Sequence, residues 1–224
     1  MDAVVKVGGS LAENPNPQAL KTLATELGST VEKYQIAVVP GGGKFADAVR
    51  ELDSKFNLPA AISHRMAILA MDQFGLLLSQ LTPKSQTCSS LKDAQKISKI
   101  GRVAILLPSN LFSTEDPFEP SWDVTSDSIA AYLAIKLHAP QLVLVTDVDG
   151  IFTENPKENT KAKLLGEVST AELLKLKKRT SVDLFLPKFL SQNPLTCHVI
   201  NGNYPERLAA VLSGKETVGT KIVA

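Results

Sequence analysis

Lys6 stands inside a short apolar run that ends in two adjacent glycines, in the stretch VVKVGGSL from Val4 to Leu11. A lysine in a buried strand is costly unless its ammonium meets an anion or reaches solvent, so we expect it at the carboxyl edge of a sheet. The backbone N–H groups of Gly8 and Gly9 can approach an oxyanion closely, and Ser10 adds a hydroxyl donor. This pattern is typical of a phosphate-binding wall, although a glycine pair after a strand is also typical of a simple turn.

A second glycine-rich segment, VVPGGGKFAD from Val38 to Asp47, repeats this pattern. A strand and a proline precede Gly41, Gly42 and Gly43, and the helix that we expect after them can bind an anion through its free amides and its dipole. The spacing is neither that of the GxxxxGKS/T P-loop nor that of the GxGxxG dinucleotide motif. Two glycine-rich strand ends in one sheet predict two clusters of phosphate or carboxylate oxygens side by side, as phosphoryl transfer between two anions requires.

Asp127 and Lys188 are two further charged residues that could serve such a transfer. Asp127 falls in the first turn of a helix predicted by WDVTSDSIAAYLA, where the helix dipole favours an acid even if its carboxylate is solvated. The functional interpretation is that this carboxylate keeps nearby lysine ammoniums charged and aimed. Lys188 is the single cation of the apolar segment SVDLFLPKFL, and a lysine of this kind commonly extends along apolar surface to reach solvent.

Thr146, Asp147, Asp149 and Gly150 end the very apolar segment LVLVTDVDGIF, Leu142 to Phe152. Ligands in open α/β sheets bind beyond the carboxyl ends of the strands, so these polar groups are expected where a nucleotide could bind. A plain Asp-Gly turn would explain part of the same pattern.

Short runs rich in valine, isoleucine and leucine alternate with helical stretches along the chain. This alternation predicts an α/β fold with a mostly parallel sheet and helices on both faces, since parallel strands need crossover connections. Helix starts are marked by Asn16 before Pro17 and by Ser169 with Glu172, which fit an N-cap with a first-turn proline and a capping box. The expected strands are Ala3–Val7, Ile36–Val39, Val103–Leu107, Leu142–Thr146 and Thr196–Ile200.

Length and composition fit a single domain spanning residues 1–224. The 224 residues are 44% hydrophobic and 21% charged, enough to bury a sizeable core. The net charge of +1, from 24 basic and 23 acidic side chains, gives no global field to recruit nucleic acid or an anionic membrane. Cys88 and Cys197 form no CxxC pair, and no apolar run approaches the roughly 20 residues of a membrane span. We therefore expect a cytoplasmic protein without a disulfide framework or a structural zinc site.

Six segments that follow one another along the chain resemble those of the amino acid kinase family, which includes acetylglutamate kinase, aspartokinase, UMP kinase and isopentenyl phosphate kinase. The resemblance implies a three-layer αβα sandwich that forms a homodimer or higher oligomer and uses ATP and Mg²⁺. It also implies that the N-terminal part binds a small phosphorylated acceptor and the C-terminal part binds the nucleotide. The six segments are KVGGSL, VVPGGGKFAD, VTSDSIAAYLA, LVTDVDGIF, VDLFLPKFL and VGTKIVA.

The same resemblance implies a role for each candidate residue. Lys6 and Lys188 would converge on the transferred phosphoryl group with Asp127 holding both lysines, and an acceptor that is already anionic would need no general base. No side chain is expected to bind a metal directly, because ATP oxygens would hold most of the Mg²⁺. The histidines are then expected to be structural or surface residues. The nucleotide and its phosphates would meet Gly8, Gly9, Ser10, Thr146, Asp147, Asp149 and Gly150, and the acceptor would meet Gly41, Gly42 and Gly43.

The segment ISHRMAILAMDQFGLLLSQL, residues 62–81, predicts a long helix that is apolar around most of its circumference. A helix of this kind must be buried, for example at a subunit interface. Asp72 in such a place needs a cationic partner or a hydrogen-bond donor. The partner is either an intersubunit contact or a positively charged substrate group, such as an amine, which Asp72 or Gln73 would bind beside the acceptor site.

This helix, with SVDLFLPKFL and VINGNYPERL, most resembles the branch of the family that phosphorylates aminomethylfuran methyl phosphate to its diphosphate in methanofuran biosynthesis. An acceptor with both a phosphate and an amine suits the glycine loop and Asp72 together. Other branches fit less well, since UMP kinase usually has GGGN with an arginine soon after, whereas this chain has GGGKFAD. The histidine of isopentenyl phosphate kinases is also missing from this loop. The alternatives are a kinase for UMP or another small phosphate, and a non-catalytic nucleotide-binding or storage subunit.

Overall fold

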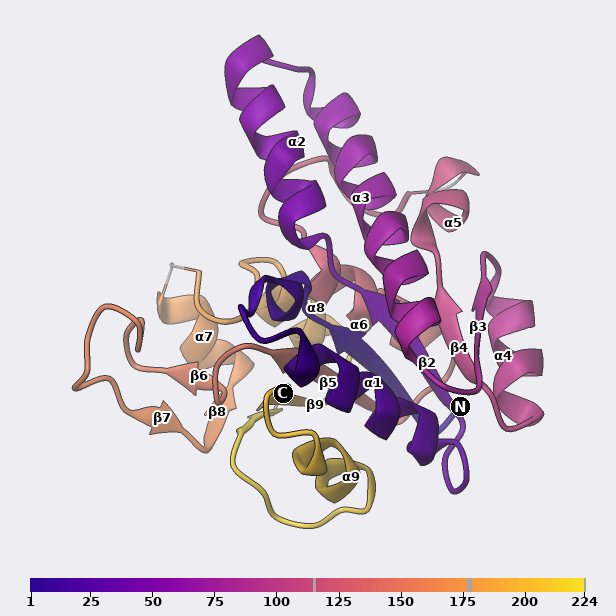
Figure 1. Cartoon of the computed structure of the whole chain (residues 1–224). Coiled ribbons are helices and arrows are strands. Elements are labelled where there is room, and N and C mark those ends of the chain that lie inside the picture. The colour runs from indigo at the N-terminus through magenta and orange to yellow at the C-terminus, as the bar shows by residue number, and fades with distance from the viewer. Residues whose placement is uncertain (115, 177–178, 224) are drawn as a thin grey trace.

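The computed structural model describes residues 1–114, 116–176 and 179–223, and these fold around an eight-stranded sheet (Figure 1). The strand order is β3-β4-β2-β1-β5-β9-β10-β8, in which β10 runs antiparallel to β9 and every other neighbouring pair is parallel. A separate antiparallel pair, β6 and β7, lies outside this sheet. The strands are β1 Ala3–Val7, β2 Ile36–Pro40, β3 Ser85–Cys88, β4 Val103–Leu106, β5 Gln141–Thr146, β6 Ile151–Phe152, β7 Leu164–Leu165, β8 Glu167–Ser169, β9 Thr196–Asn201 and β10 Thr220–Val223.

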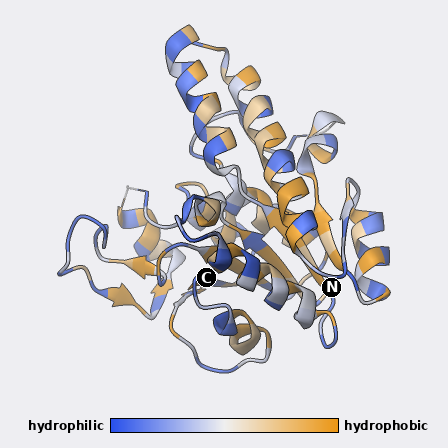
Figure 2. Ribbon diagram, viewed as in Figure 1, coloured by the Kyte–Doolittle hydropathy of each residue, from blue (hydrophilic) through white to orange (hydrophobic). Residues whose placement is uncertain are grey.

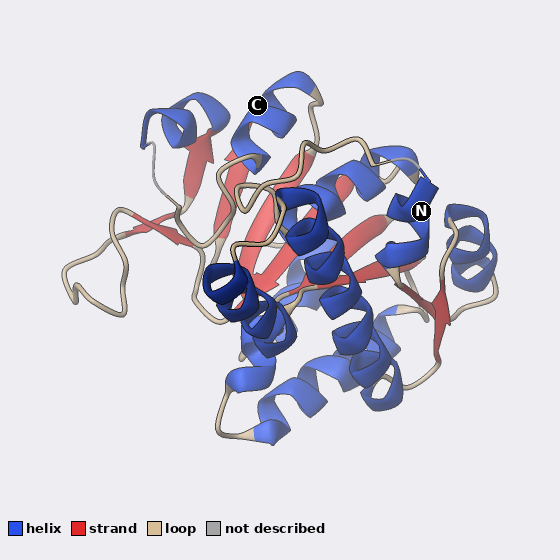
Figure 3. Ribbon diagram, turned by 90° about the horizontal axis from the view of Figure 1, so that it is seen from above, coloured by secondary structure: helices blue, strands red, loops and turns tan. Residues whose placement is uncertain are grey.

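Helices cover both faces of the sheet (Figure 3), so the predicted three-layer αβα sandwich is confirmed. Val5 and Val7 of β1 join one apolar cluster with α1 and α9, whereas Val4 joins another with α4, α6 and α8. Successive side chains of a strand point to opposite faces, which explains this division. The helices are η1 Gly9–Glu13, α1 Pro17–Thr30, α2 Gly43–Phe56, α3 Ala60–Leu81, α4 Leu91–Lys99, α5 Pro108–Thr114, α6 Ser126–Lys136, α7 Thr170–Leu176, α8 Leu186–Gln192 and α9 Glu206–Leu212.

Both predicted helix starts are confirmed. The Asn16 side chain accepts a hydrogen bond from the backbone N–H of Gln18 at the start of α1. At α7, the Glu172 carboxylate accepts from the Ser169 amide, and the Glu172 amide donates back to the Ser169 hydroxyl. The five expected strands are present within one or two residues of their predicted ends, whereas the short strands β3, β6, β7, β8 and β10 were not predicted.

The helices α2 and α3 pack side by side and extend beyond the sheet (Figure 1). Figure 2 shows hydrophobic residues on the central strands and also along α3. Within the single chain α3 is only partly buried, because Ile62, Leu69, Leu76 and Leu77 keep between 41% and 54% of their surface exposed, so burial of this helix at a subunit interface stays a prediction. In the part of the chain that the structure describes, no helix is both long and apolar enough to cross a membrane.

Candidate active site

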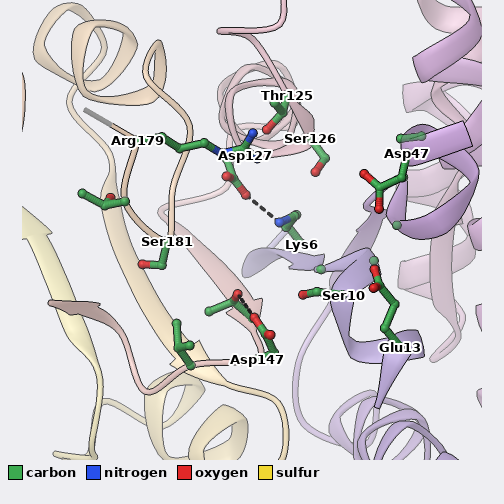
Figure 4. A pocket seen from close by; sticks show the side chains of 18 of the residues that line it. Lys6, Ser10, Glu13, Asp47, Thr125, Ser126, Asp127, Asp147, Arg179 and Ser181 are labelled. Carbon is green, nitrogen blue, oxygen red and sulfur yellow. Dashed lines mark hydrogen bonds and ion pairs between the residues drawn. The ribbon is translucent and has the colours of Figure 1, made fainter. Parts of the chain in front are cut away.

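A cavity of about 730 Å³ opens where the carboxyl ends of β1, β2 and β5 meet the N-termini of α2 and α6 (Figure 4). This is the edge of an open α/β sheet at which ligands bind. Both glycine-rich loops reach it, and so do the polar groups that follow β5. The residues of the sequence analysis that line this cavity are Lys6, Gly8, Gly9, Ser10, Gly42, Gly43, Asp127, Thr146, Asp147 and Gly150.

Lys6 and Asp127 form a buried ion pair in the wall of the cavity. The Lys6 Nζ lies 2.7 Å from Oδ1 of Asp127, and the two side chains keep only 10% and 5% of their surface exposed. Lys6 shares a face of β1 with Val4, and that face packs against α6, which begins one residue before Asp127. The alternation of the strand and the first turn of the helix therefore bring these charges together.

Both oxygens of the Asp127 carboxylate have a neighbour. Its Oδ1 meets the Lys6 ammonium as an ionic partner but receives no hydrogen bond among the described residues, and its Oδ2 accepts a hydrogen bond of 3.1 Å from the backbone N–H of Asp183. Asp127 is 3% exposed, so it is not the solvated helix-terminal acid that was one interpretation of the sequence. Its orientation depends on two segments distant in sequence.

The two glycine-rich loops pack directly against each other. A Cβ atom on Gly9 would lie 2.1 Å from the backbone nitrogen of Gly43, and one on Gly41 would lie 2.6 Å from the nitrogen of Gly9. Gly43 also has a φ of +51°, in the left-handed region that side chains disfavour. Gly41 is buried in this contact and does not line the cavity, whereas Gly42 and Gly43 do.

Asp147 marks the β5 side of the cavity. Its Oδ2 accepts a hydrogen bond of 2.5 Å from the Lys157 ammonium, and Thr146 donates to its Oδ1. Burial acts to raise the pKa of Asp147, but the hydrogen bond and charge of Lys157 outweigh it, so that the pKa is lowered. The carboxylate is therefore held ionised by a lysine from the loop between β6 and β7.

Asp149 is not brought to the cavity. Its Oδ1 lies 2.6 Å from Arg207 of α9 and accepts a hydrogen bond of 3.1 Å from Asn201 at the end of β9. Two residues after Asp147, this carboxylate ties the turn to neighbouring elements. The expectation that Asp149 contacts the nucleotide is not supported by this position.

Lys188 is also absent from the cavity lining, so the predicted convergence of Lys6 and Lys188 is not present in the structure. Lys188 is exposed on α8, with its Nζ 5.8 Å from the centre of the Phe185 ring. Leu186 and Leu190 face the core from the same helix. Each lies two residues from Lys188, which at about 100° per residue places the lysine on the opposite, solvent-facing side.

Asp72 and Gln73 lie outside the cavity as well. Asp72 accepts hydrogen bonds from the backbone amide and the hydroxyl of Ser109, at the start of α5. Gln73 is exposed. The face of α3 that reaches the cavity carries His64, Ala67, Ile68 and Met71 instead. Asp72 follows Met71 by about 100° around the helix, and this rotation directs it to α5.

The α2 side of the cavity carries charged and aromatic groups that the sequence analysis did not single out. Arg50 lies 3.0 Å from Oδ1 of Asp47, one turn earlier on α2, and its guanidinium stacks 4.4 Å above the Trp122 ring. The indole N–H of Trp122 donates to the Asp53 carboxylate over 2.7 Å, which lowers the pKa of Asp53. The i, i+3 spacing of Asp47 and Arg50 behind the glycines was the available sequence signal.

His64 lines the cavity, although its expected role was structural. Its side chain is buried, and Nε2 lies 2.8 Å from Oδ2 of Asp116, while Oδ1 of the same carboxylate accepts a hydrogen bond from the backbone N–H of Phe118. The loop between α5 and α6 thus holds the imidazole of this α3 residue in place. No local pattern could have linked these residues, because they come from different segments.

Further polar side chains complete the lining, from η1, from the loop between β6 and β7, and from the segment that follows α7. Figure 4 shows Glu13 extending into the cavity from η1, on the same side as Asp47 of α2. These groups lie in stretches that lack any motif of their own. They are Glu13, Glu154, Asn155, Lys157, Glu158, Arg179, Thr180 and Ser181.

Glycine amides and a buried cation at the ends of parallel strands are what transfer of a phosphoryl group needs. Residues 1–190 match the sequence profile of the amino acid kinase family, and the chain belongs to that family, as its motifs predict. The chain is 36% identical to [5-(aminomethyl)furan-3-yl]methyl phosphate kinase of Methanocaldococcus jannaschii over 222 residues, which cover 98% of this chain and 97% of that protein. It is 27% identical to uridylate kinase of Pyrococcus abyssi, over 96% of both chains.

Solved structures of similar fold include uridylate kinases. The enzyme from Archaeoglobus fulgidus aligns over the full length of both chains with a TM-score of 0.78 and 25% identity. The UMP kinase from Bacillus anthracis aligns over 99% of this chain and 95% of its own with a TM-score of 0.81 and 20% identity. These relatives are phosphotransferases, so both the predicted family and the predicted enzyme class are confirmed.

Proposed function

We propose that the protein transfers the γ-phosphoryl group of ATP to the phosphate of a small acceptor, and that this acceptor is aminomethylfuran methyl phosphate. The observation that carries the proposal is the buried Lys6–Asp127 pair, which lies in the cavity wall beside two interlocked glycine loops. The similarity to the M. jannaschii kinase, at 36% identity over nearly the whole chain, supports this acceptor. The product would be the corresponding diphosphate.

The reaction is a single displacement at phosphorus. An oxygen of the acceptor phosphate attacks the γ-phosphorus, the bond from that phosphorus to the β–γ bridging oxygen breaks, and ADP leaves with the electron pair. Lys6 would stabilise the charge that spreads over the equatorial oxygens, and Asp127 would keep the ammonium charged and in place. Because the acceptor is already anionic, no proton has to be removed from it.

The β5 side of the cavity is the proposed nucleotide side. Ser10, Thr146 and the Lys157 ammonium could meet ATP phosphates there, and Asp147 holds Lys157 within reach. The described residues contain no cluster of three or more His, Cys, Asp or Glu side chains able to hold a metal ion. Mg²⁺ accompanying ATP would neutralise phosphate charge and would be bound mainly by phosphate oxygens and water, with the Asp147 carboxylate on the same side of the cavity.

The α2 side is the proposed acceptor side. The first turn of α2 has amides without helical partners, which suit the acceptor phosphate, and Arg50 is a second cation within the lining. Glu13 and Asp47 are carboxylates on the same side, suited to an ammonium group. In this arrangement Asp47 and Glu13 replace Asp72 and Gln73 as the candidate contacts of the amine.

Phosphorylation of UMP is the second candidate function. The uridylate kinase relatives and the A. fulgidus structure favour it, because they align with nearly the whole chain. UMP has no ammonium group, so carboxylates on the acceptor side would give it no contact. We infer that the aminomethylfuran acceptor fits better, since this chain has GGGKFAD with the carboxylate of Asp47, whereas UMP kinases usually have GGGN with an arginine soon after.

A homodimer or higher assembly in the cytoplasm belongs to the same proposal. The exposed leucines and isoleucine of α3 form an apolar face that a second copy of the chain could cover. The relatives' function in small-molecule metabolism suits a cytoplasmic location. Mass measurement in solution at several protein concentrations would test the assembly, and a purely monomeric protein would contradict it.

The function is tested by incubating the purified protein with Mg²⁺ and ATP and with one acceptor at a time. We expect ADP release and diphosphate formation with aminomethylfuran methyl phosphate, and much slower turnover with UMP. Faster turnover with UMP would replace the first function by the second. ATP binding without turnover on any phosphate or carboxylate acceptor would favour a nucleotide-binding subunit.

A further inference from the structure

Asp183 is a buried acid that no motif of the sequence analysis singled out. It is 2% exposed and does not line the 730 Å³ cavity. Its carboxylate accepts hydrogen bonds from five donors, at distances from 2.6 to 3.0 Å. These donors are the amide and hydroxyl of Thr125, the amide and hydroxyl of Ser128, and the amide of Leu186.

The five donors belong to the starts of two helices. Thr125 is the N-cap position of α6 and Ser128 lies in its first turn, whereas Leu186 is the first residue of α8. The Thr125 side chain does not cap α6 itself, so the Asp183 carboxylate takes the place of a local cap. A single side chain therefore joins the amino ends of α6 and α8.

Asp183 also contacts the Asp127 carboxylate directly. Its backbone N–H donates to Oδ2 of Asp127, whose Oδ1 faces the Lys6 ammonium. The carboxylate of Asp183 thus fixes the helix that carries Asp127, and its amide fixes the plane of the Asp127 carboxylate. A shift of Asp183 would change the direction in which Asp127 presents Oδ1 to Lys6.

The burial of Asp183 next to the carboxylate of Asp127 disfavours the ionised form of its side chain. Burial raises the pKa of Asp183, the charge of Asp127 raises it further, and hydrogen bonds from Ser128 and Thr125 act in the opposite direction. A buried carboxylate beside another carboxylate costs stability unless it is fully hydrogen-bonded. Backbone N–H donors face both oxygens of Asp183, so an amide side chain of similar size would turn its own N–H groups toward at least one of them, and only a carboxylate can accept from all five donors.

We propose that Asp183 is a positioning residue for phosphoryl transfer, which holds Asp127 so that Lys6 is aimed at the transferred group. This inference rests on the proposed function for its effect on rate, but the positioning of Lys6 exists without substrates. Asp183 does not touch the reacting atoms. Its removal should affect the alignment of Lys6 more than the affinity for either substrate.

The test uses Asp183→Asn and the milder Ser128→Ala, which deletes only the hydroxyl donor at 2.6 Å. We expect kcat to fall about tenfold to hundredfold for Asp183→Asn and less for Ser128→Ala, with KM for ATP and acceptor nearly unchanged, because misalignment acts on the transition state. Asp93→Asn is the matched control, since Asp93 accepts from Ser90 at the start of α4, away from the cavity. If the Asp183 variant does not fold, Ser128→Ala carries the test.

Double variants with Lys6→Arg distinguish a role in positioning Lys6 from a general role in stability. In a Lys6→Arg background, the further loss of kcat from Ser128→Ala or Asp183→Asn should be several-fold smaller than in the wild type, because the aimed group has already been changed. An equal loss in both backgrounds, or a lower melting temperature with wild-type kcat, would overturn the proposal.

The NMR signals of the Lys6 side chain in the ligand-free protein give a readout that needs no turnover. We expect them to move in Ser128→Ala and Asp183→Asn and to stay in place in Asp93→Asn. Unchanged Lys6 signals would overturn the positioning role. Shifted signals in a protein that phosphorylates no acceptor would leave the positioning role intact and refute the proposed function.

Discussion

The Lys6 ammonium lies 2.7 Å from the Asp127 carboxylate in a site where both side chains are almost completely buried. Buried ion pairs of this kind contribute little net stability, because the cost of desolvation offsets most of the attraction. An anion in the adjoining cavity would gain from the same ammonium without a further desolvation cost to the protein. The pair is therefore better explained by ligand chemistry than by the stability of the fold.

Removing the Lys6 charge should abolish most of the activity. We expect Lys6→Met to lower kcat about 100-fold to 1,000-fold, by loss of a charge aimed at the transition state. The change also leaves Asp127 buried and unpaired, which lowers the free energy of unfolding. The double variant Lys6→Met with Asp127→Asn restores neutrality, so its stability should recover while its kcat stays low. Recovery of kcat along with stability would contradict a catalytic role for Lys6.

Lys188→Ala tests the position that the structure gives to Lys188. Because Lys188 is exposed on α8 and outside the cavity, we expect its removal to leave kcat within about threefold of the wild type. Steady-state kinetics with ATP and acceptor would measure this. A loss comparable to that of the Lys6 variant would mean that α8 rearranges when substrates bind and brings Lys188 to the phosphates.

The fold could be predicted from the sequence because its signals are local. Apolar runs such as Leu142–Thr146 are buried on both faces, and Asn16 and Ser169 mark helix starts through contacts within three residues. The strands that were not predicted are short and partly exposed. Their pairing partners, such as β9 for β10, are supplied only by the tertiary structure.

The site could be predicted only in part. Lys6 is indicated by a charge inside a strand, and Asp127 by an acid in the first turn of a helix. The structure places both residues in the site as these local patterns predict. The predicted position of Lys188 required knowing which face of α8 packs against the core, and the local sequence does not specify this. Asp183 looks like an ordinary cap of α8, because it accepts from Leu186 three residues later. Its contacts with α6 involve a distant segment and leave no trace in the local sequence.

The contact between the two glycine loops predicts a specific sensitivity at Gly9. A Cβ atom there would meet the backbone of Gly43, which cannot move aside as a flexible side chain would. We expect Gly9→Ala to reduce the free energy of unfolding by about 1–3 kcal/mol or more and to lower kcat, because both loops shift. Gly166→Ala is the control, since a Cβ atom at that residue would meet nothing within 4 Å. Thermal unfolding and steady-state kinetics of Gly9→Ala and Gly166→Ala would test this. Equal losses of stability and kcat in the two variants would contradict the close contact between the glycine loops.

Asp47→Asn tests recognition of the ammonium group on the acceptor side. The side chain of Asp47 is 52% exposed, and exposed ion pairs contribute only about 0.2–1 kcal/mol. We therefore expect KM for aminomethylfuran methyl phosphate to rise by up to about fivefold, with KM for ATP unchanged. An acceptor that lacks the amine should show no such change.

Glu51→Gln is a matched control for Asp47→Asn, because Glu51 is exposed on the same helix but does not line the cavity. It alters the charge of α2 by the same amount. If both variants raise KM equally, the effect comes from the general field of the helix. If neither does, Asp47 does not contact the amine.

His198 predicts a pH dependence of stability that is independent of the active site. It is half-buried on β9, beside Lys221 of β10, and burial, followed by the charge of Lys221, lowers its pKa. A lowered pKa means that the unfolded chain binds this proton more readily, so the free energy of unfolding should fall as the pH drops below about 6.5, the ordinary value for histidine. His198→Gln should remove this component. Denaturant unfolding of both proteins at about pH 8 and about pH 5.5, on either side of that value, measures it, and an identical decrease in the two proteins would show that His198 is not its source.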